Sequence, residues 1–185
     1  MEYISLIFIA VLLLALLALL RPGMRFASQR PEDYAATGPA FDLRTHLNGP
    51  ILSEGMIHGP TGRVNSRFLA KMHGKWEGAH GILTEDFTFA GGRTQRREWS
   101  LRLGNDGRFT ATAPDVIGIA TGEVSGAAIC MRYRIRLEPD AGGHVLSVTD
   151  WLYLMENGVI LNRSEMRKFG VKVAELTATM RPLAA

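Results

Sequence analysis

Residues 150–170 of this 185-residue chain read DWLYLMENGVILNRSEMRKFG. Side chains of different character alternate on both sides of the pair Asn157-Gly158. Such alternation is typical of a β-strand whose two faces have different surroundings. An Asn-Gly pair between two such segments is a strong signal for a tight hairpin turn. The stretch therefore predicts two antiparallel strands.

The same pattern continues through most of the chain. From about residue 41 onward, alternating segments are separated by turns at Pro60-Thr61-Gly62, Gly91-Gly92, Asp106-Gly107, Ser125-Gly126, Gly142-Gly143 and Asn157-Gly158. These turns divide the chain into roughly ten strands. A meander of this size must protect its edges, so we predict an all-β antiparallel meander that closes into a barrel of about 8–10 strands. A two-sheet sandwich is the alternative.

The N-terminal part has a different composition. Residues 4–20 are apolar except for Ser5, which approaches the ~17–25 residues of a membrane-spanning helix. No small-residue cleavage site follows, so we predict that residues 1–21 form an uncleaved transmembrane anchor, with a cleaved signal segment as the second choice. Residues 22–40 are predicted to be a linker with little structure, and residues 41–181 to form the barrel domain.

The register of the 150–170 hairpin decides which side chains face the interior. With a two-residue loop at Asn157-Gly158, Tyr153 pairs with Asn162 and Trp151 pairs with Ser164. We expect this face to be the interior, and it comprises Trp151, Tyr153, Met155, Ile160, Asn162, Ser164 and Met166. Charged groups are seldom buried unpaired. The other face carries the charged residues Asp150, Arg163, Glu165 and Arg167 and is expected outside.

The position of Glu175 depends on the next turn, near Phe169-Gly170. A two-residue loop puts Glu175 on the face of Ser164, inside the barrel. A three-residue loop puts it beside Arg163, where it forms an outer ion pair. The sequence leaves both open.

A second hairpin combines an ion pair with a tryptophan. If Gly91-Gly92 is a two-residue loop, Asp86 pairs with Arg97 and Thr84 pairs with Trp99. The Asp86–Arg97 pair then either orients a ligand or acts as an internal strut.

Composition and motifs exclude several classes of function. The formal charge of +3 is too small to argue for nucleic-acid binding, and no recognition motif accompanies it. The five histidines have no metal-ligand spacing, and the single cysteine, Cys130, cannot complete a zinc site. Ser164 near Glu175 lacks a histidine base. The sequence therefore indicates no catalytic residues, no metal and no cofactor.

Several short motifs together resemble a known family. They are Phe41-Asp42-Leu43, Asn48-Gly49-Pro50, Gly74-x-Trp76-x-Gly78, Leu83-x-Glu85-Asp86-Phe87, Arg97-x-Trp99, Asp115-Val116-x-Gly118-x-Ala120-x-Gly122, Asp150-Trp151 and Asn162-Arg163-x-x-Met166-x-Lys168-Phe169-Gly170. The pattern is similar to the bacterial domain-of-unknown-function family 3833, whose members are often labelled lipoproteins. The resemblance implies a lipocalin-like fold and an exported, membrane-held protein. It carries no established activity.

The resemblance and the apolar segment together predict a location. This chain has no cysteine after the apolar segment, so a transmembrane helix would replace the lipid anchor. We predict a single-pass protein of the bacterial inner membrane with its barrel in the periplasm. Arg21, Arg25 and Arg30 follow the segment and favour the opposite, cytoplasmic orientation.

We carry three hypotheses of function from the sequence. The first is a membrane-tethered barrel that binds a hydrophobic small molecule or lipid. The predicted lining residues are Asp86, Arg97, Trp99, Trp151, Tyr153, Asn162, Ser164 and Glu175. The second is a filled barrel that acts as an envelope scaffold, with an exposed apolar patch over Leu152 and Leu154. The third is an enzyme acting on a lipid-like substrate.

Overall fold

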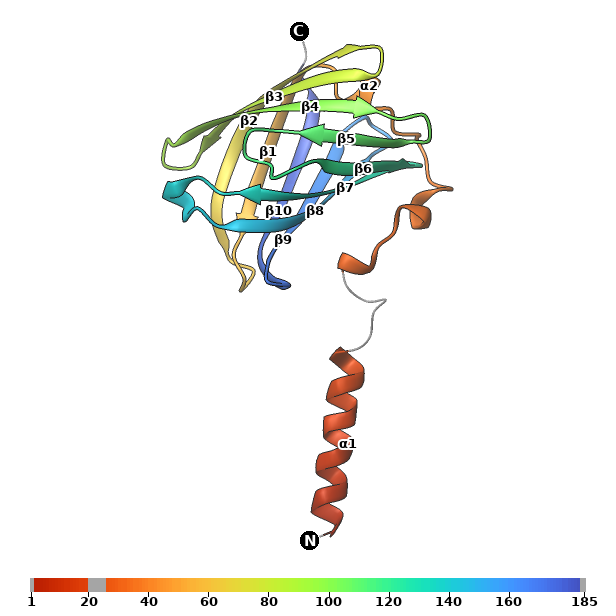
Figure 1. Cartoon of the computed structure of the whole chain (residues 1–185), viewed down its shortest axis with the longest axis vertical. Coiled ribbons are helices and arrows are strands. Elements are labelled where there is room, and N and C mark those ends of the chain that lie inside the picture. The colour runs from red at the N-terminus through yellow and green to blue at the C-terminus, as the bar shows by residue number, and fades with distance from the viewer. Residues whose placement is uncertain (1, 20–25, 184–185) are drawn as a thin grey trace.

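The computed structural model shows a closed antiparallel β-barrel (Figure 1). It describes residues 2–19 and 26–183. The strands found there are β1 (Gly49–His58), β2 (Val64–Glu77), β3 (His80–Phe89), β4 (Thr94–Leu103), β5 (Arg108–Thr112), β6 (Ala120–Ser125), β7 (Ala128–Arg136), β8 (Val145–Leu154), β9 (Ile160–Lys168) and β10 (Val171–Pro182). Each strand pairs with the next, and β1 also pairs with β10, which closes the barrel. The predicted all-β, lipocalin-like barrel is confirmed, with ten strands in the described residues.

The N-terminal helix α1 (Glu2–Leu19) corrects the predicted anchor. The structure describes 18 residues in this helix. Within residues 2–19 and 26–183, no helix has the length and hydropathy that a membrane crossing requires. The prediction of a transmembrane helix, and of the single-pass inner-membrane location that depended on it, is therefore wrong. Residues 1, 20 and 21 of the predicted anchor lie outside the described residues.

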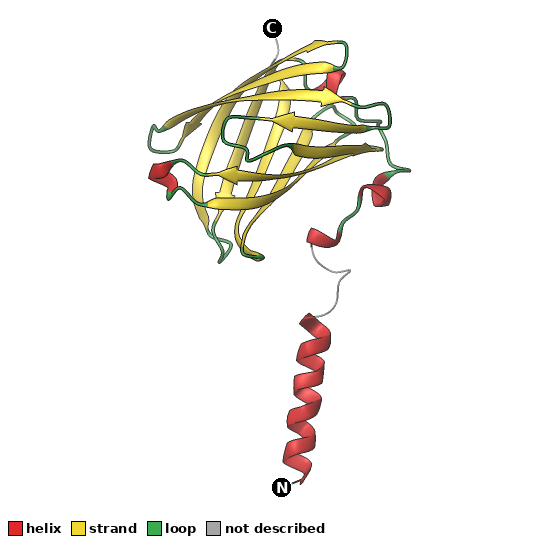
Figure 2. Ribbon diagram, in the orientation of Figure 1, coloured by secondary structure: helices red, strands yellow, loops and turns green. Residues whose placement is uncertain are grey.

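The segment between α1 and the barrel contains short helices, whereas residues 22–40 are predicted to have little structure. It contains two short 3-10 helices, η2 (Phe26–Ser28) and η3 (Pro31–Tyr34), which Figure 2 shows in red. The Tyr34 ring lies 5.2 Å from the Trp151 ring and 5.5 Å from the Tyr153 ring, measured between centroids. The Tyr153 hydroxyl donates a hydrogen bond to Gln29 Oε1 at 2.7 Å. The segment thus covers part of the outer surface of β8.

A single turn of helix, α2 (Leu43–His46), closes one end of the barrel. Its first turn begins with a cap, in which Asp42 Oδ1 accepts a hydrogen bond from the Arg44 amide at 2.9 Å. Leu43 and Leu47 are buried in the main apolar core. The Trp76 indole donates to the Leu47 carbonyl at 2.9 Å, which fixes the end of this turn against β2.

Four hairpins share one loop form, which sets the register of the barrel. In each hairpin, the amide of the residue before a three-residue loop donates to the carbonyl of the residue after it. The four pairs are Gly59–Arg63, Phe89–Arg93, Gly104–Arg108 and Met155–Val159. The last loop residue has a positive φ, at Gly62, Gly92, Gly107 and Gly158. This is the three-residue loop in which glycine takes the left-handed position. A loop one residue longer than predicted shifts the register by one and exchanges the two faces.

The β8–β9 hairpin shows this exchange. Asp150 pairs with Ser164 and Leu152 pairs with Asn162, whereas Trp151 pairs with Arg163. The predicted pairing of Trp151 with Ser164 and of Tyr153 with Asn162 is therefore wrong. Asn162 and Ser164 do face inward, but they do so with Asp150 and Leu152 rather than with the two aromatic residues.

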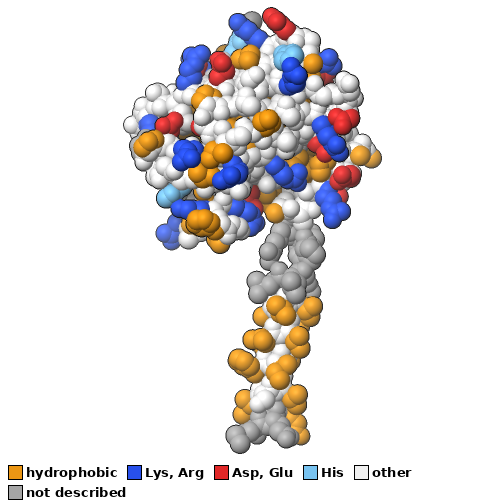
Figure 3. Space-filling view, viewed as in Figure 1, with side chains coloured by type: hydrophobic (Ala, Val, Ile, Leu, Met, Phe, Trp, Pro, Cys, Tyr) orange, Lys and Arg blue, Asp and Glu red, His pale blue; other side chains and the backbone are white. Residues whose placement is uncertain are grey.

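The β3–β4 hairpin differs from its prediction in the same way. Glu85 pairs with Arg97 and Leu83 pairs with Trp99. Asp86 pairs with Arg96, and these two exposed side chains form an ion pair at 3.5 Å on the outer wall. Figure 3 shows many such charged side chains, of both signs, over the visible outer face of the barrel. The predicted Asp86–Arg97 pair is wrong.

Glu175 lies on the outer wall because of a register shift within β10 and not because of the loop length. The loop at Phe169-Gly170 has two residues, because Val171 pairs with Lys168. The register then shifts between Lys172 and Ala174, which puts Glu175 opposite Glu165. Glu175 consequently forms an ion pair with Arg163 at 2.5 Å, outside the barrel.

Candidate functional site

The barrel encloses a cavity of about 460 Å³. Its closed end lies beneath Leu43 and Leu47, next to α2. Exposed residues of the β3–β4 and β7–β8 connections, among them Arg93 and Glu138, line the other end. Asn65, at the start of β2, is another exposed residue that lines this end, so we take this end as the mouth of the cavity. The volume falls within the roughly 300–1,000 Å³ of small-molecule pockets.

Apolar side chains form most of the cavity wall. Near the mouth, Phe68 and Phe87 make an edge-to-face contact with ring centroids 5.3 Å apart, and Phe89 stacks on Phe87 at 5.9 Å. Toward the closed end the wall is built by Leu83, Leu101, Phe109, Ile129 and Leu152. These two apolar zones leave the polar side chains at mid-depth.

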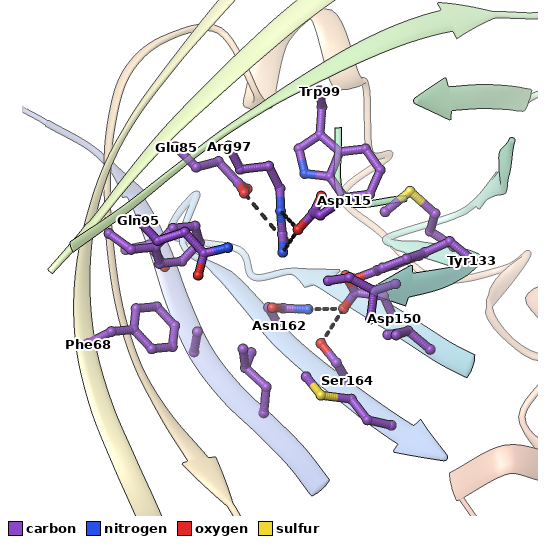
Figure 4. A pocket seen from close by; sticks show the side chains of 18 of the residues that line it. Phe68, Glu85, Gln95, Arg97, Trp99, Asp115, Tyr133, Asp150, Asn162 and Ser164 are labelled. Carbon is purple, nitrogen blue, oxygen red and sulfur yellow. Dashed lines mark hydrogen bonds and ion pairs between the residues drawn. The ribbon is translucent and has the colours of Figure 1, made fainter. Parts of the chain in front are cut away.

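The polar side chains form a belt around the middle of the cavity (Figure 4). The polar belt consists of Glu85 on β3, Arg97 on β4, Asp115 in the β5–β6 connection, Tyr133 on β7, Asp150 on β8, and Asn162 and Ser164 on β9. Strand alternation directs the six of these residues that lie on strands inward, while their chain neighbours lie on the outer side of the wall. A belt of convergent polar groups inside an apolar cavity is the usual form of a small-molecule site.

Arg97 is held between two carboxylates. Its Nε and Nη2 donate to Asp115 Oδ2 at 2.9 and 2.6 Å, and its Nη1 lies 3.7 Å from Glu85 Oε2. The guanidinium also lies 5.7 Å from the Trp99 ring centroid. Trp99 in turn packs edge-to-face on Tyr133, with centroids 5.3 Å apart. The guanidinium is therefore fixed by ion pairs and by an aromatic wall.

Asp115 enters the cavity because its loop is joined to β7. The Arg136 amide donates to the Asp115 carbonyl, and the Ile117 amide donates to the Arg134 carbonyl, both at 2.8 Å. Val116 makes an isolated bridge with Ile135. These contacts hold the β5–β6 connection against the barrel wall and direct the Asp115 carboxylate toward Arg97.

A second group of hydrogen bonds surrounds Asp150. Its Oδ1 accepts from the Ser164 hydroxyl at 2.6 Å and from the Asn162 amide. The Asn162 amide also donates to the Trp151 carbonyl at 3.0 Å, which fixes its orientation. Asp150 Oδ1 thus accepts from two side chains that occupy successive inward-facing positions of β9.

Burial changes the proton affinity of these acids. It raises the pKa of Glu85 to about 7, although Arg97 acts in the opposite direction. It also raises the pKa of Asp150, against the hydrogen bonds from Ser164 and Asn162. The pKa of Tyr133 is raised well above its ordinary value, first by burial and then by the charge of Asp150. Tyr133 therefore stays a neutral phenol inside the cavity.

The structure brings together half of the residues predicted to line a site. Arg97, Trp99, Asn162 and Ser164 line the cavity. Asp86, Trp151, Tyr153 and Glu175 do not line it and lie on the outer side of the wall. Trp151 and Tyr153 stack on each other beneath Tyr34, so their aromatic surface serves to hold the N-terminal segment.

The sequence interpretation missed Glu85, Asp115, Tyr133 and Asp150. Tyr133 had a readable signal, because Met131, Tyr133 and Ile135 alternate with three exposed arginines on β7. Glu85 and Asp150 face inward because each of their hairpins has a three-residue loop in place of the predicted two-residue loop. Asp115 lies in a connection between short strands, where no periodicity shows its direction. Among the described residues, no cluster of His, Cys, Asp and Glu could hold a metal ion.

The fold and the cavity define a lipocalin-like barrel, and the comparison with known proteins agrees. The structure of Rv2717c from M. tuberculosis is similar, with a TM-score of 0.56 and 17% identity over 80% of this chain and 99% of that one. The S-type phycobiliprotein lyase CPES from Guillardia theta also has a TM-score of 0.56, with 5% identity over 76% of this chain and 90% of that one. At these identities the likeness is one of fold. No curated protein matches the chain.

The chain belongs to a family described as "Protein of unknown function (DUF3833)", whose model matches residues 23–182. The match confirms the family predicted from the motifs. It includes the segment that covers Trp151 on the outer wall as well as the whole barrel.

Proposed function

We propose that the barrel binds a small molecule that has an apolar body and a polar group. The observation that carries this proposal is the polar belt at mid-depth in a mainly apolar cavity of about 460 Å³. A protein that needed only a stable core would fill this space, since buried polar groups and voids both reduce stability. A binding protein keeps the space and places its polar groups where they orient the ligand.

The hypothesis of a filled scaffold predicts different features. It requires a packed interior and an exposed apolar patch over Leu152 and Leu154. Both side chains are instead buried on the inner side of β8, at 8% and 4% exposure. The cavity and the position of these two residues favour ligand binding over the scaffold.

A cavity-filling substitution tests the proposal. Ala174 lines the cavity on β10, whereas Thr177 on the same strand is exposed and borders only the outer wall. We expect the full chain to bind an uncharged fluorescent probe, N-phenyl-1-naphthylamine, with enhanced emission. Ala174→Phe should weaken this binding by about tenfold or more, because a phenyl group occupies the same space. Thr177→Phe is the matched control.

The comparison of the two variants separates the cavity from other apolar surfaces, including α1. If Ala174→Phe and Thr177→Phe bind the probe as the unchanged protein does, the probe is not in the cavity and the proposal fails. Unfolding curves of both variants show whether the barrel is intact. Native mass spectrometry of the purified protein offers a second measurement, in which a retained small molecule appears as added mass.

A further inference from the structure

The polar belt contains more acidic groups than basic ones. It contains one guanidinium, that of Arg97, against the three carboxyl groups of Glu85, Asp115 and Asp150. Glu85 Oε2 and Asp115 Oδ1 are both buried and have no hydrogen-bond partner in the described part of the chain. Glu85 is only 7% exposed. Buried acceptors of this kind are nearly always satisfied in the functional state of a protein.

Arg97 is poorly placed to receive an anionic ligand. Its Nε and Nη2 point at Asp115, and its Nη1 points at Glu85. A ligand carboxylate beside Arg97 would also lie close to these two acids, and like charges at short range repel each other. Displacing one of the acids would leave it buried without its countercharge, which is strongly unfavourable.

Asp150 is better placed to receive a cation. Its Oδ1 takes the hydrogen bonds of Ser164 and Asn162, and no hydrogen bond within the described residues reaches its Oδ2. Asp150 lines the cavity and keeps part of its surface exposed there. No ion pair with a basic side chain is seen for Asp150 in residues 26–183. Burial raises the pKa of Asp150, and a cation bound beside it would act in the opposite direction by stabilising the ionised carboxylate.

From these contacts we infer that the cavity selects an amphiphile with a protonated amine as its polar head over one with a carboxylate head. The ammonium lies at the polar belt and donates to Asp150, and the apolar chain extends toward Phe87 and Phe89 at the mouth. This inference rests on the proposed function, because it names the class of ligand for the same cavity.

Three amphiphiles of equal chain length test the inference. A primary alkyl amine, the corresponding alcohol and the corresponding fatty acid are each titrated against the full chain loaded with N-phenyl-1-naphthylamine, at neutral pH and below their micellar concentrations. We expect the amine to displace the probe at a concentration about tenfold or more below that of the alcohol, because a hydrogen bond to a charged group is worth more than a neutral one. The fatty acid should be the weakest of the three.

A conservative substitution locates the effect. Asp150→Asn keeps the shape and still accepts from Ser164 and Asn162, but it removes the charge. We expect it to abolish the preference for amine over alcohol, and we expect Glu85→Gln to reduce this preference. Asp86→Asn, on the outer wall, is the matched control and should keep the preference. The readout is the ratio of the affinities for the amine and the alcohol. A substitution that weakens the binding of all ligands equally leaves this ratio unchanged.

The outcomes separate the two proposals. A fatty acid that binds as tightly as the amine, or an amine preference that persists in Asp150→Asn, overturns the inference and leaves the proposed function standing. If none of the three amphiphiles displaces the probe, and Ala174→Phe binds the probe normally, the proposed function itself fails.

Discussion

Glu85 and Arg97 lie directly opposite each other on β3 and β4, and both side chains point into the barrel. The two charged groups are 3.7 Å apart. Arg97 has a second and closer partner in Asp115, so it does not neutralise Glu85 alone. The consequence is an acid whose proton affinity is set mainly by burial.

This relationship predicts that Glu85 makes the stability of the barrel depend on pH. The pKa of Glu85 is raised from 4.5 to about 7 in the folded protein. Between pH 4.5 and about 7 the folded state holds a proton that the unfolded state has lost. The protonated Glu85 therefore contributes its full stabilisation below pH 4.5, and this stabilisation is lost as the pH rises to about 7. The loss is on the order of 3 kcal/mol. Glu85 faces Arg97, Asp115, Tyr133, Asp150 and Trp99.

Chemical denaturation at about pH 5 and about pH 8 measures this contribution. Other acids titrate in the same range, so the informative quantity is the difference between the unchanged protein and Glu85→Gln. The variant should lose less free energy of unfolding between the two pH values. Asp86→Asn removes an exposed acid on the same strand and should behave as the unchanged protein does. Equal pH dependence in Glu85→Gln and the unchanged protein would contradict the prediction.

Strand alternation, the meander and the family could all be predicted from the sequence, because side-chain period and glycine turns are local signals. The faces could not be predicted, because they depend on whether a loop has two residues or three. Asn157-Gly158 and Gly91-Gly92 are compatible with both lengths, and one added residue exchanges inside and outside. The two-residue loop before Glu175 is one of the two lengths that the sequence allows. The register shift near Val173, which puts Glu175 on the outer wall, has no signal in the sequence.

The exchange of faces explains why half of the candidate site was missed. Trp151 was expected inside because it is large and apolar, and it is indeed 1% exposed. It is buried on the outer wall, by Tyr34 and other residues of the N-terminal segment. A barrel wall has a second apolar side wherever another segment covers it, and hydrophobicity alone does not distinguish the two sides.

The cover over Trp151 predicts a change in the reactivity of Cys130. This residue is the single cysteine of the chain, and it belongs to the same outer cluster as Trp151 and Tyr34. Burial raises the pKa of its thiol to about 11, so the thiol is both covered and protonated at neutral pH. Tyr34→Ala removes part of the cover, and we expect thiol-specific reagents to label Cys130 faster, by about tenfold or more.

The labelling is followed under native conditions by absorbance or by mass. Glu32→Ala changes an exposed residue of the same 3-10 helix, η3, and serves as the control. Labelling of Tyr34→Ala at the rate of the unchanged protein would mean that the N-terminal segment does not protect Cys130. Unfolding curves of the variant distinguish local exposure from a loss of the whole barrel.

The turn between β9 and β10 predicts a stabilising substitution. Phe169 is 95% exposed and has a φ of 51°, and it is the one residue other than glycine with a positive φ in the described part of the chain. The two-residue loop Phe169-Gly170 is of the kind that Asn-Gly fills best, because asparagine tolerates the left-handed conformation. Phe169→Asn should therefore raise the free energy of unfolding by about 1 kcal/mol. Val171→Asn, at an exposed position next to the loop, should give no gain, and equal stabilities of the two variants in urea denaturation would show that the backbone at Phe169 is not strained.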